Sequence, residues 1–381
     1  MDFTLSEAQH DLAGLARTVL TDWTAKNEPD ATGLDSKLWS DFAHSGLLEA
    51  ALPAPVGGGL SVLEQCSVLI EIGRTVAPAP YLTSVAIAAT AIAQFGDEEQ
   101  WTRWAAPIAA GTATFAVALS TEDDRFTAER TAGGWRVRGS HSAVPAGAFA
   151  DAFLVEAVTA DGRLLLVFDR ATPGLRIIEQ HVVDGSDAAL VELDTVVGHA
   201  AAIGTPGDGS AQWAHRRAII AACAYQLGVV ERGLELTSEY AITRRQFDKP
   251  IGEFQAVRQR LADAYLDVEA VRLTLWQAAW RESEGLPADA EVATAKFWAA
   301  EAGHRVAHTM VHVHASIGIF LEYQVHRYFT AAKRTEFLFG AATEQLRTLA
   351  DVLAVDSAWQ PSRTAGSVDG SRTAGGVVAG E

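Results

Sequence analysis

Three side chains near the middle of the chain have the chemistry to hold a charged, partly aromatic ligand. Arg244, Gln246 and Phe247 lie within the segment Tyr240-Ala-Ile-Thr-Arg-Arg-Gln-Phe-Asp-Lys-Pro-Ile-Gly-Glu-Phe-Gln255. An arginine offers a planar fork of N–H donors to phosphate oxygens, and a phenylalanine offers a flat face for stacking. The segment therefore predicts a site for a ligand that contains both a diphosphate and a flat ring.

Two long helical patterns must hold these side chains in place. Residues on one helix face recur at steps of three and four over 220–237 and again over 254–268. Pro250 and Gly252 interrupt the periodicity between the two patterns. We therefore expect the three side chains at the exposed end of a helix hairpin. The alternative is a capped, solvated helix end that binds no ligand.

Length and charge restrict the possible partners. The 381 residues are sufficient for two or three domains with a large core. Apolar residues make up 49% of the chain and charged residues 20%, as in ordinary soluble proteins. The formal net charge is -18 and the isoelectric point is near 5.0. Because nucleic acids and anionic membranes bind clustered Lys and Arg, this charge argues against both partners.

The first residues and the cysteines bear on the cellular compartment. The chain begins with an acidic, polar stretch over residues 1–7, unlike a signal peptide. The longest apolar run, at about residues 85–95, is too short to span a bilayer. Cys66 and Cys223 are too few and too far apart for a disulfide framework. We therefore expect a cytoplasmic protein without a membrane segment.

Residues 1–112 predict an α-helical N-terminal domain. The first helix has an apolar face from Phe3 to Val19, and Asp35 has the chemistry to cap a second helix that ends near Gly46. A loop rich in proline and glycine follows. Further helices are expected over residues 60–76, 82–95 and 97–111.

Residues 113–208 predict a middle β domain. Short apolar runs there are separated by turns rich in glycine and aspartate, a pattern typical of strands. The expected strands cover residues 114–119, 135–138, 152–156, 164–168 and 189–193.

Residues 209–355 predict a C-terminal four-helix bundle. Besides the two patterns already described, helical stripes recur over 292–313 and 338–353. Four long stripes joined by short turns are typical of an antiparallel bundle, so the expected fold class is α+β. The last residues, 356–381, contain Ser-Arg-Thr-Ala-Gly twice and predict a disordered tail.

The segment that ends at Gln255 resembles the Tyr-x-x-x-Arg-x-Gln-Phe-Gly-x-Pro-Ile-x-x-Phe-Gln motif of the acyl-CoA dehydrogenase family, with Asp248 where glycine is usual. The resemblance extends over residues 1 to about 353, and the family has the same order of helical domain, β domain and four-helix bundle. It implies FAD as cofactor and an acyl-CoA thioester as substrate. It also implies that the arginine, glutamine and phenylalanine of the motif bind the ADP half of FAD across a dimer interface, in the neighbouring subunit's active site.

The catalytic base of the family is missing from this sequence. In the family, a glutamate removes the α-proton of the thioester while the β-hydrogen leaves as hydride to the flavin. Phe339 stands at the usual glutamate position, and Ala218 stands at the position that a minority of the family uses instead. Neither side chain accepts a proton, so we assign no catalytic residue. Glu336, one helical turn before Phe339, is the fallback candidate, and Glu344 is a weaker one.

The segments that cradle the flavin ring in the family also differ here. The first of them lacks the family's Gly-Ser-Asp, although Thr121 can still contact the ring. Ala143 and Pro145 stand where the family has a tryptophan over the ring and a threonine near flavin N5. The resemblance therefore implies a weakened site for the ring in this subunit.

The missing residues are those that would hold the flavin ring and the base in this subunit's own active site. Arg244, Gln246 and Phe247, which in the family bind the FAD of the neighbouring subunit, are retained. A second segment that reaches the neighbour's FAD in the family, Gln-x-x-Gly-Gly, is His312-Val-His-Ala-Ser316 here. The differences imply a weaker contact of this segment with FAD. We assign His312, Ser316 and Gly318 to cofactor binding. The pattern resembles the base-less subunit of heteromeric acyl-CoA dehydrogenases from bacterial steroid side-chain degradation. It implies a hetero-oligomer, such as a heterotetramer, with a homologous catalytic subunit.

Two other functions stay open at this point. A self-sufficient FAD enzyme would use Glu336 as a relocated base, although a solvated carboxylate beside Lys333 and Arg334 is the simpler interpretation. A flavin-dependent oxygenase on the same scaffold would need no α-proton base. His304, His308 and His312 recur at steps of four, and two such histidines can bind zinc. No carboxylate or cysteine is spaced to complete the ligand set, so we expect no metal site.

Overall fold

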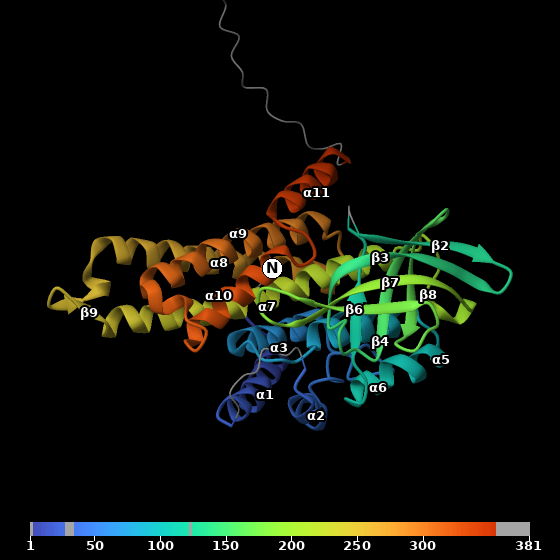
Figure 1. Ribbon diagram of the computed structural model, residues 1–381, viewed down its shortest axis with the longest axis horizontal. Helices are drawn as coiled ribbons and strands as arrows, with labels where there is room; N and C mark the ends of the chain where they lie inside the picture. The colour runs from blue at the N-terminus through green and yellow to red at the C-terminus, as the bar shows by residue number, and fades with distance from the viewer. Residues whose placement is uncertain (1–2, 27–33, 122–123, 356–381) are drawn as a thin grey trace, which may run out of the picture.

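The chain folds into a helical region, a β-sheet region and a second helical region, in that order (Figure 1). The computed structural model describes residues 3–26, 34–121 and 124–355. The tail that the sequence predicts to be disordered, residues 356–381, lies outside the described residues. Along the described residues, no helix is both long and apolar enough to cross a bilayer.

The N-terminal region consists of helices, as predicted. The side chain of Asp35 accepts hydrogen bonds from the backbone N–H groups of Lys37 and Leu38, which confirms it as the cap of the second helix. Asp97 caps the segment that follows in the same way, through the N–H of Gln100. The elements are α1 (Glu7–Thr24), α2 (Ser36–His44), α3 (Val62–Thr75), η1 (Leu82–Ala89), α4 (Thr90–Phe95), α5 (Glu98–Gln100), η2 (Trp101–Ala105) and α6 (Ala106–Ala109).

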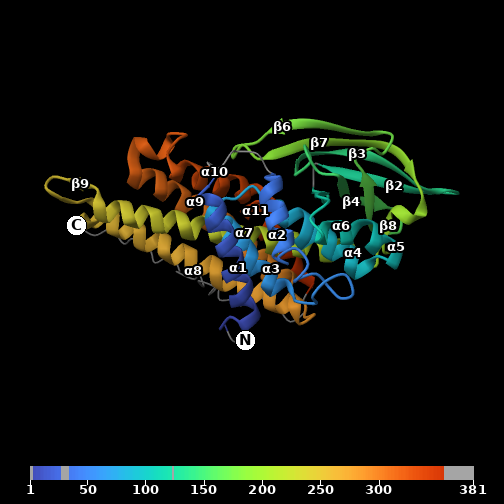
Figure 2. The same ribbon diagram turned by 90° about the horizontal axis from the view of Figure 1, so that it is seen from below.

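Eight strands form one mixed sheet, and seven of them follow the order β6-β7-β3-β2-β4-β5-β8. The remaining strand, β1, pairs in parallel with β4. Figure 2 shows this sheet over α4, α5 and α6 at one end of the molecule. The strands are β1 (Phe115–Ala118), β2 (Arg125–Thr131), β3 (Gly134–Pro145), β4 (Ala152–Thr159), β5 (Gly162–Asp169), β6 (Leu175–His181), β7 (Asp187–Val197) and β8 (Ala202–Ile203), with the short helix η3 (His199–Ala201) before β8.

Both faces of the central strands are buried. On β4, Phe153 and Val155 belong to the core inside the β region, whereas Ala152 and Leu154 belong to the core shared with the helices. Burial on both sides favours continuous apolar runs over strict alternation. This is why the runs at β4 and β5 stand out in the sequence.

The sequence does not predict β2 and β6, the two longest strands that the structure adds; the two-residue strands β8, β9 (Arg245–Gln246) and β10 (Lys249–Pro250) are additional too. In β2, the buried Phe126 and Ala128 alternate with exposed residues, and Arg125 and Glu129 flank them. The strand β6 pairs along its whole length with β7, from Leu175 to His181. Pairing with a neighbouring strand, rather than local apolar content, therefore fixes both strands.

The C-terminal region is a bundle of long helices, but its fourth helix differs from the prediction. The predicted stripe over 338–353 begins too early, because Leu338 and Phe339 lie in the turn that separates α10 from α11. The helix α10 packs against α7 and α9, whereas α11 contacts α9 and extends away from the other helices in Figure 1. The elements are α7 (Ser210–Thr243), β9 (Arg245–Gln246), β10 (Lys249–Pro250), η4 (Ile251–Glu253), α8 (Gln255–Ser283), α9 (Asp289–His314), η5 (Ala315–Ile319), α10 (Gln324–Phe337) and α11 (Ala342–Val355).

Glycines allow α3 to lie directly against the backbone of α7, which joins the two helical regions. A Cβ atom added at Gly228 would lie 2.0 Å from the carbonyl oxygen of Ile70. One added at Gly73 would lie 2.1 Å from the carbonyl oxygen of Tyr225. Neither neighbour is a flexible side chain, so a larger residue at either position must push the helices apart.

The substitution Gly228→Ala is therefore expected to lower the free energy of unfolding by about 2 to 3 kcal/mol, the cost of overpacking a close contact. Gly14→Ala in α1 is the matched control, because a Cβ atom there meets nothing within 4 Å. The control should be neutral or stabilise by up to about 1 kcal/mol through helix propensity. Denaturant unfolding of the two variants measures the difference. Equal effects would show that the approach of α3 to α7 is not tight.

Candidate functional site

The predicted nucleotide contacts lie on a tight hairpin between α7 and α8. The strands β9 and β10 pair in antiparallel fashion, Gln246 with Lys249 and Arg245 with Pro250. Phe247 and Asp248 form the two-residue turn and have φ angles of 51° and 63°. Both positions need a left-handed backbone, which aspartate tolerates better than most residues. This geometry explains why Asp248 can replace the family's glycine.

The side chains of this hairpin project away from the rest of the chain. Phe247 is 86% exposed, at the tip of the turn. Figure 1 shows the hairpin at the end of α7 and α8 that lies farthest from the sheet. Arg244 and Gln246 are also exposed, and no described residue forms a side-chain hydrogen bond or ion pair with either. We call Arg244, Gln246 and Phe247 the hairpin group; their functional groups are free to bind another molecule.

The second segment predicted to reach a neighbour's FAD lies at the same end of the bundle. His314 stacks on Tyr240, one turn before the hairpin, with ring centroids 4.3 Å apart. His312 and Ser316 are exposed, whereas Gly318 is buried. A Cβ atom at Gly318 would lie 3.2 Å from Cα of Val311, so the glycine lets η5 lie back on α9. The structure therefore brings both of these segments to one end of the molecule.

The predicted flavin-ring contacts are at the opposite end of α7. Thr121 is exposed, and its hydroxyl oxygen accepts a hydrogen bond from the N–H of Asp124 at 3.0 Å. The helix α7 runs from the sheet to the hairpin over 34 residues, which corresponds to about 50 Å. A single chain therefore cannot bring Thr121 and the hairpin group to one cofactor.

The edge of β3 that would face a flavin ring is occupied by polar groups of this chain. Ala143 has a φ angle of 50°, at an irregularity in the pairing of β3 with β7. Arg334 of α10 donates from Nη2 to the carbonyl oxygen of Ala143 at 3.1 Å. Pro145 follows and has neither a hydroxyl nor an N–H group. At this edge the family has a tryptophan ring and a threonine hydroxyl for the flavin. This chain has the carbonyl group of Ala143 and the guanidinium of Arg334 there instead.

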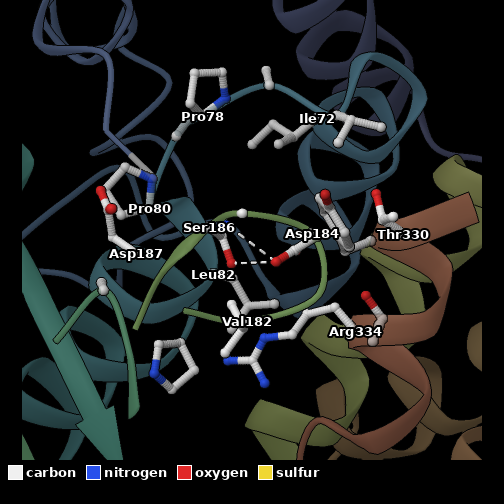
Figure 3. A pocket seen from close by; sticks show the side chains of 18 of the residues that line it. Ile72, Pro78, Pro80, Leu82, Val182, Asp184, Ser186, Asp187, Thr330 and Arg334 are labelled. Atoms are coloured by element: carbon white, nitrogen blue, oxygen red, sulfur yellow. Dashed lines mark hydrogen bonds between the residues drawn. The ribbon is translucent and has the colours of Figure 1, made fainter. Parts of the chain in front are cut away.

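A cavity of about 570 Å³ lies beside this edge, between the N-terminal helices, the loop after β6 and α10 (Figure 3). We call it the central cavity. Its walls are mainly apolar, with Arg327, Arg334 and His326 on one side. Asp184 and Asp187 are its carboxylates, and Oδ1 of Asp184 accepts a hydrogen bond of 2.7 Å from the hydroxyl of Ser186. The cavity is large enough for an acyl group, and its carboxylates are at neither family position for a base.

Neither of the two expected base positions has a proton acceptor. Phe339 has a φ angle of 58° in the turn after α10, and its half-buried ring packs on the helical core. Ala218 is completely buried in α7. A left-handed φ angle is unfavourable for a phenylalanine by roughly 1 to 2 kcal/mol, so the turn is held by its surroundings.

Lys296, which is not among the residues predicted for the site, helps to hold the turn that contains Phe339. Its buried ammonium group donates to the carbonyl oxygens of Thr335 and Glu336 at 3.1 and 3.0 Å. Burial lowers the pKa of Lys296 to about 8. The lysine thereby satisfies the last carbonyl groups of α10, immediately before the Phe339 turn. A lysine inside an otherwise apolar helix stripe was the available sequence signal.

The fallback base candidates point elsewhere. The carboxylate of Glu336 binds the ammonium group of Lys333, and it lies 3.3 Å from Nδ1 of His304. Glu336 does not line the central cavity, and Glu344 is an exposed residue of α11. The geometry favours a structural ion pair for Glu336 over a role as relocated base.

A buried carboxylate joins the sheet to the start of α7, and so sets the direction of the helix that carries the hairpin group. Glu156 of β4 is fully buried, and its carboxylate binds Nε2 of His215 in α7. Arg163 lies 3.0 Å from its other oxygen. Burial alone would raise the pKa of Glu156, but the hydrogen bond and charge of His215 and the charge of Arg163 keep it below the ordinary value.

Glu156→Gln is therefore expected to lower the free energy of unfolding at neutral pH by about 3 kcal/mol. Because the folded-state pKa of Glu156 is lowered, its contribution is fully present above the unfolded value of about 4.3 and is lost as the pH falls through the folded value. Urea unfolding at pH 7 and pH 4 should show the difference from wild type shrinking at the lower pH. Glu192→Gln, in an exposed pair with Arg176, is the control and should cost less than about 1 kcal/mol. A pH-independent difference would exclude this role of the Glu156 charge.

Known proteins share this architecture along nearly the whole chain. Two family models match, one described as acyl-CoA dehydrogenase, N-terminal domain, over residues 6–112, and one as acyl-CoA dehydrogenase, C-terminal domain, over residues 209–354. A relative from Mycobacterium tuberculosis, acyl-CoA dehydrogenase FadE27, is 44% identical over 371 residues, covering 93% of this chain and 99% of the relative.

Two similar solved structures are of complexes. A chain of the ChsE4-ChsE5 complex from Mycobacterium tuberculosis has a TM-score of 0.86 and 43% identity, covering 93% of this chain and 99% of that chain. A chain of a variant of the Tcur3481-Tcur3483 steroid ACAD has a TM-score of 0.84 and 34% identity, covering 92% of this chain and 99% of that chain. Both are named for two different gene products.

Proposed function

Because the chain belongs to the acyl-CoA dehydrogenase family, we propose that it is the subunit of a hetero-oligomer that completes the FAD site of a catalytic homologue. The single observation that carries the proposal is the separation of the two halves of the FAD site. All three residues of the hairpin group are exposed, and neither Arg244 nor Gln246 has a side-chain hydrogen-bond or ion-pair partner among the described residues. The edge that would hold this chain's own flavin ring is instead occupied by Arg334 and the carbonyl of Ala143.

The role of the hairpin group follows from its chemistry. The guanidinium of Arg244 would bind diphosphate oxygens through parallel N–H donors, and the ring of Phe247 would pack on the cofactor or on the partner. Gln246 adds an amide that can donate and accept. Because the paired strands β9 and β10 fix the backbone of the hairpin, little backbone freedom is lost when these groups bind.

The partner supplies the chemistry in this proposal. FAD bound there would accept the β-hydrogen of the thioester as hydride while a carboxylate of the partner removes the α-proton. This chain has Phe339 and Ala218 at the two base positions, so it holds the cofactor without moving the proton. The partner is therefore a homologue that retains a glutamate at the base position.

The names of two similar structures support one class of acyl group as the substrate. One of the similar solved structures is named a steroid ACAD, and both are complexes of two different chains. We assign this chain to the same class, with a steroid side-chain thioester as the substrate of the assembled complex.

The visible spectrum and the native mass of the protein test the proposal. The chain should be colourless or unstable when it is expressed alone. Expressed together with a homologous subunit, it should form a yellow heterotetramer with fewer flavins than subunits. A yellow homo-oligomer that is bleached by an acyl-CoA would overturn the proposal and would favour a self-sufficient enzyme.

A further inference from the structure

A second cavity, of about 380 Å³, shares no lining residue with the hairpin group or with the central cavity. It lies where the start of α7 meets the start of α3, α4 and the α8–α9 turn, and we call it the Arg217 cavity. Three of its lining residues are charged, namely Arg216, Arg217 and Glu282. Its uncharged walls include Ala51, Pro53, Leu60, Ser61, Val62, Thr90, Trp213 and Leu286.

Arg217 is a buried cation without an acidic partner. The residue is 7% exposed, and its Nη2 donates to the amide oxygen of Gln65. Its guanidinium also lies over the ring of Trp213, 5.2 Å from the ring centroid. Among the described residues, no carboxylate forms an ion pair with Arg217, and no residue accepts a hydrogen bond from its Nε or Nη1. A buried charge with so few partners is costly unless an anion completes the site.

Among the described residues, the carboxylates nearest to the cavity form their ion pairs with Arg216 rather than with Arg217. Glu282 accepts a hydrogen bond of 2.7 Å from Nε of Arg216, and that pair is further joined by the exposed Asp289, 3.3 Å from Nη1 of Arg216. Burial raises the pKa of the neighbouring Cys66 to about 12, so its thiol stays neutral. Burial also raises the pKa of Tyr81, whose buried hydroxyl has no hydrogen-bond partner among the described residues. The lining of the cavity therefore has one positive charge in excess.

The remaining walls define what else a ligand must have. Pro53, Leu60, Val62 and Leu286 supply apolar surface, and Trp213 supplies an aromatic ring. Ser61 and Thr90 supply hydroxyl groups. From the buried guanidinium and these walls, we infer that the Arg217 cavity binds a small carboxylate that has an apolar body. The carboxylate would bind the free Nε and Nη1 donors of Arg217, and the apolar body would lie against the four aliphatic side chains.

Benzoate is a suitable probe, with benzamide as its neutral analogue and inorganic phosphate as an anion without an apolar body. Titration calorimetry on the full chain should detect binding of benzoate, and benzamide and phosphate should bind at least about tenfold more weakly. Arg217→Gln should weaken benzoate binding by roughly tenfold to a hundredfold. Arg103→Gln is the matched control, because Arg103 also lies over a tryptophan ring but is exposed and remote from the cavity.

A second variant blocks the cavity without removing the buried charge of Arg217. Leu286 is 41% exposed at the cavity wall, so Leu286→Trp should fill the cavity while leaving Arg217 in place. It should weaken benzoate binding to a similar extent. Absence of benzoate binding to the wild type, or binding by both cavity variants that equals wild type, would overturn the inference. Phosphate binding that is tighter than benzoate binding would overturn the assignment to carboxylates.

Discussion

The purified chain alone is expected to oxidise acyl-CoA thioesters at least about a hundredfold more slowly than the hetero-oligomer. General-base catalysis typically contributes a factor of about 10² to 10⁴, and Phe339 and Ala218 cannot provide it. The chain also lacks the groups that hold a flavin ring, so the loss in the isolated chain should be at the upper end of this range. Turnover with a dye acceptor, compared at equal subunit concentration, measures the ratio.

Variants of this chain within the hetero-oligomer distinguish the proposal from a relocated base. Glu336→Gln should leave turnover unchanged, because Glu336 is held by Lys333 and lies outside the central cavity. Asp184→Asn is the matching variant for a carboxylate that does line the cavity. If either substitution lowered turnover by a hundredfold or more, the base would reside in this chain, and the self-sufficient enzyme would replace the proposed role.

The hairpin and the long helices were predictable because the residues that define them are close together in the sequence. Proline, glycine and a left-handed aspartate interrupt two regular patterns, and that interruption is sufficient to expose Arg244. The cap at Asp35 was equally local, since its side chain binds N–H groups within three residues. Strands that are buried on both faces were recognisable because each is a short, continuous apolar run.

Features that depend on contacts between distant segments were not predictable. The helix α10 is amphipathic, but the helical stripes expected over 292–313 and 338–353 leave its residues out. The position of Lys296 within an apolar helix stripe hints at burial, but only packing shows which carbonyl groups it binds. For Arg217, packing alone shows that its charge is buried. The contact of Arg334 with Ala143 joins residues 191 positions apart, so no local pattern indicates it.

Arg244→Ala is expected to lower the FAD content of the hetero-oligomer by weakening FAD binding roughly tenfold to a hundredfold. Hydrogen bonds to a charged group are worth about 1.5 to 3 kcal/mol, and roughly every 1.4 kcal/mol is tenfold in affinity. Flavin absorbance per complex after gel filtration measures the loss. The native mass should stay that of the heterotetramer, because the hairpin backbone is fixed by the paired strands rather than by the Arg244 side chain.

Two further substitutions distinguish the planar N–H donors of Arg244 from its positive charge and from the shape of the hairpin. Arg244→Lys keeps the positive charge but loses the planar pair of donors, so it should restore only part of the flavin. Arg245→Ala removes the neighbouring guanidinium, which donates to the carbonyl oxygen of Asp248 and serves the turn. That variant should keep its flavin if the turn survives. Unchanged flavin content in Arg244→Ala would exclude a role of this chain in holding the partner's FAD. An equal loss in Arg245→Ala would show that the shape of the hairpin, rather than the Arg244 fork, holds the cofactor.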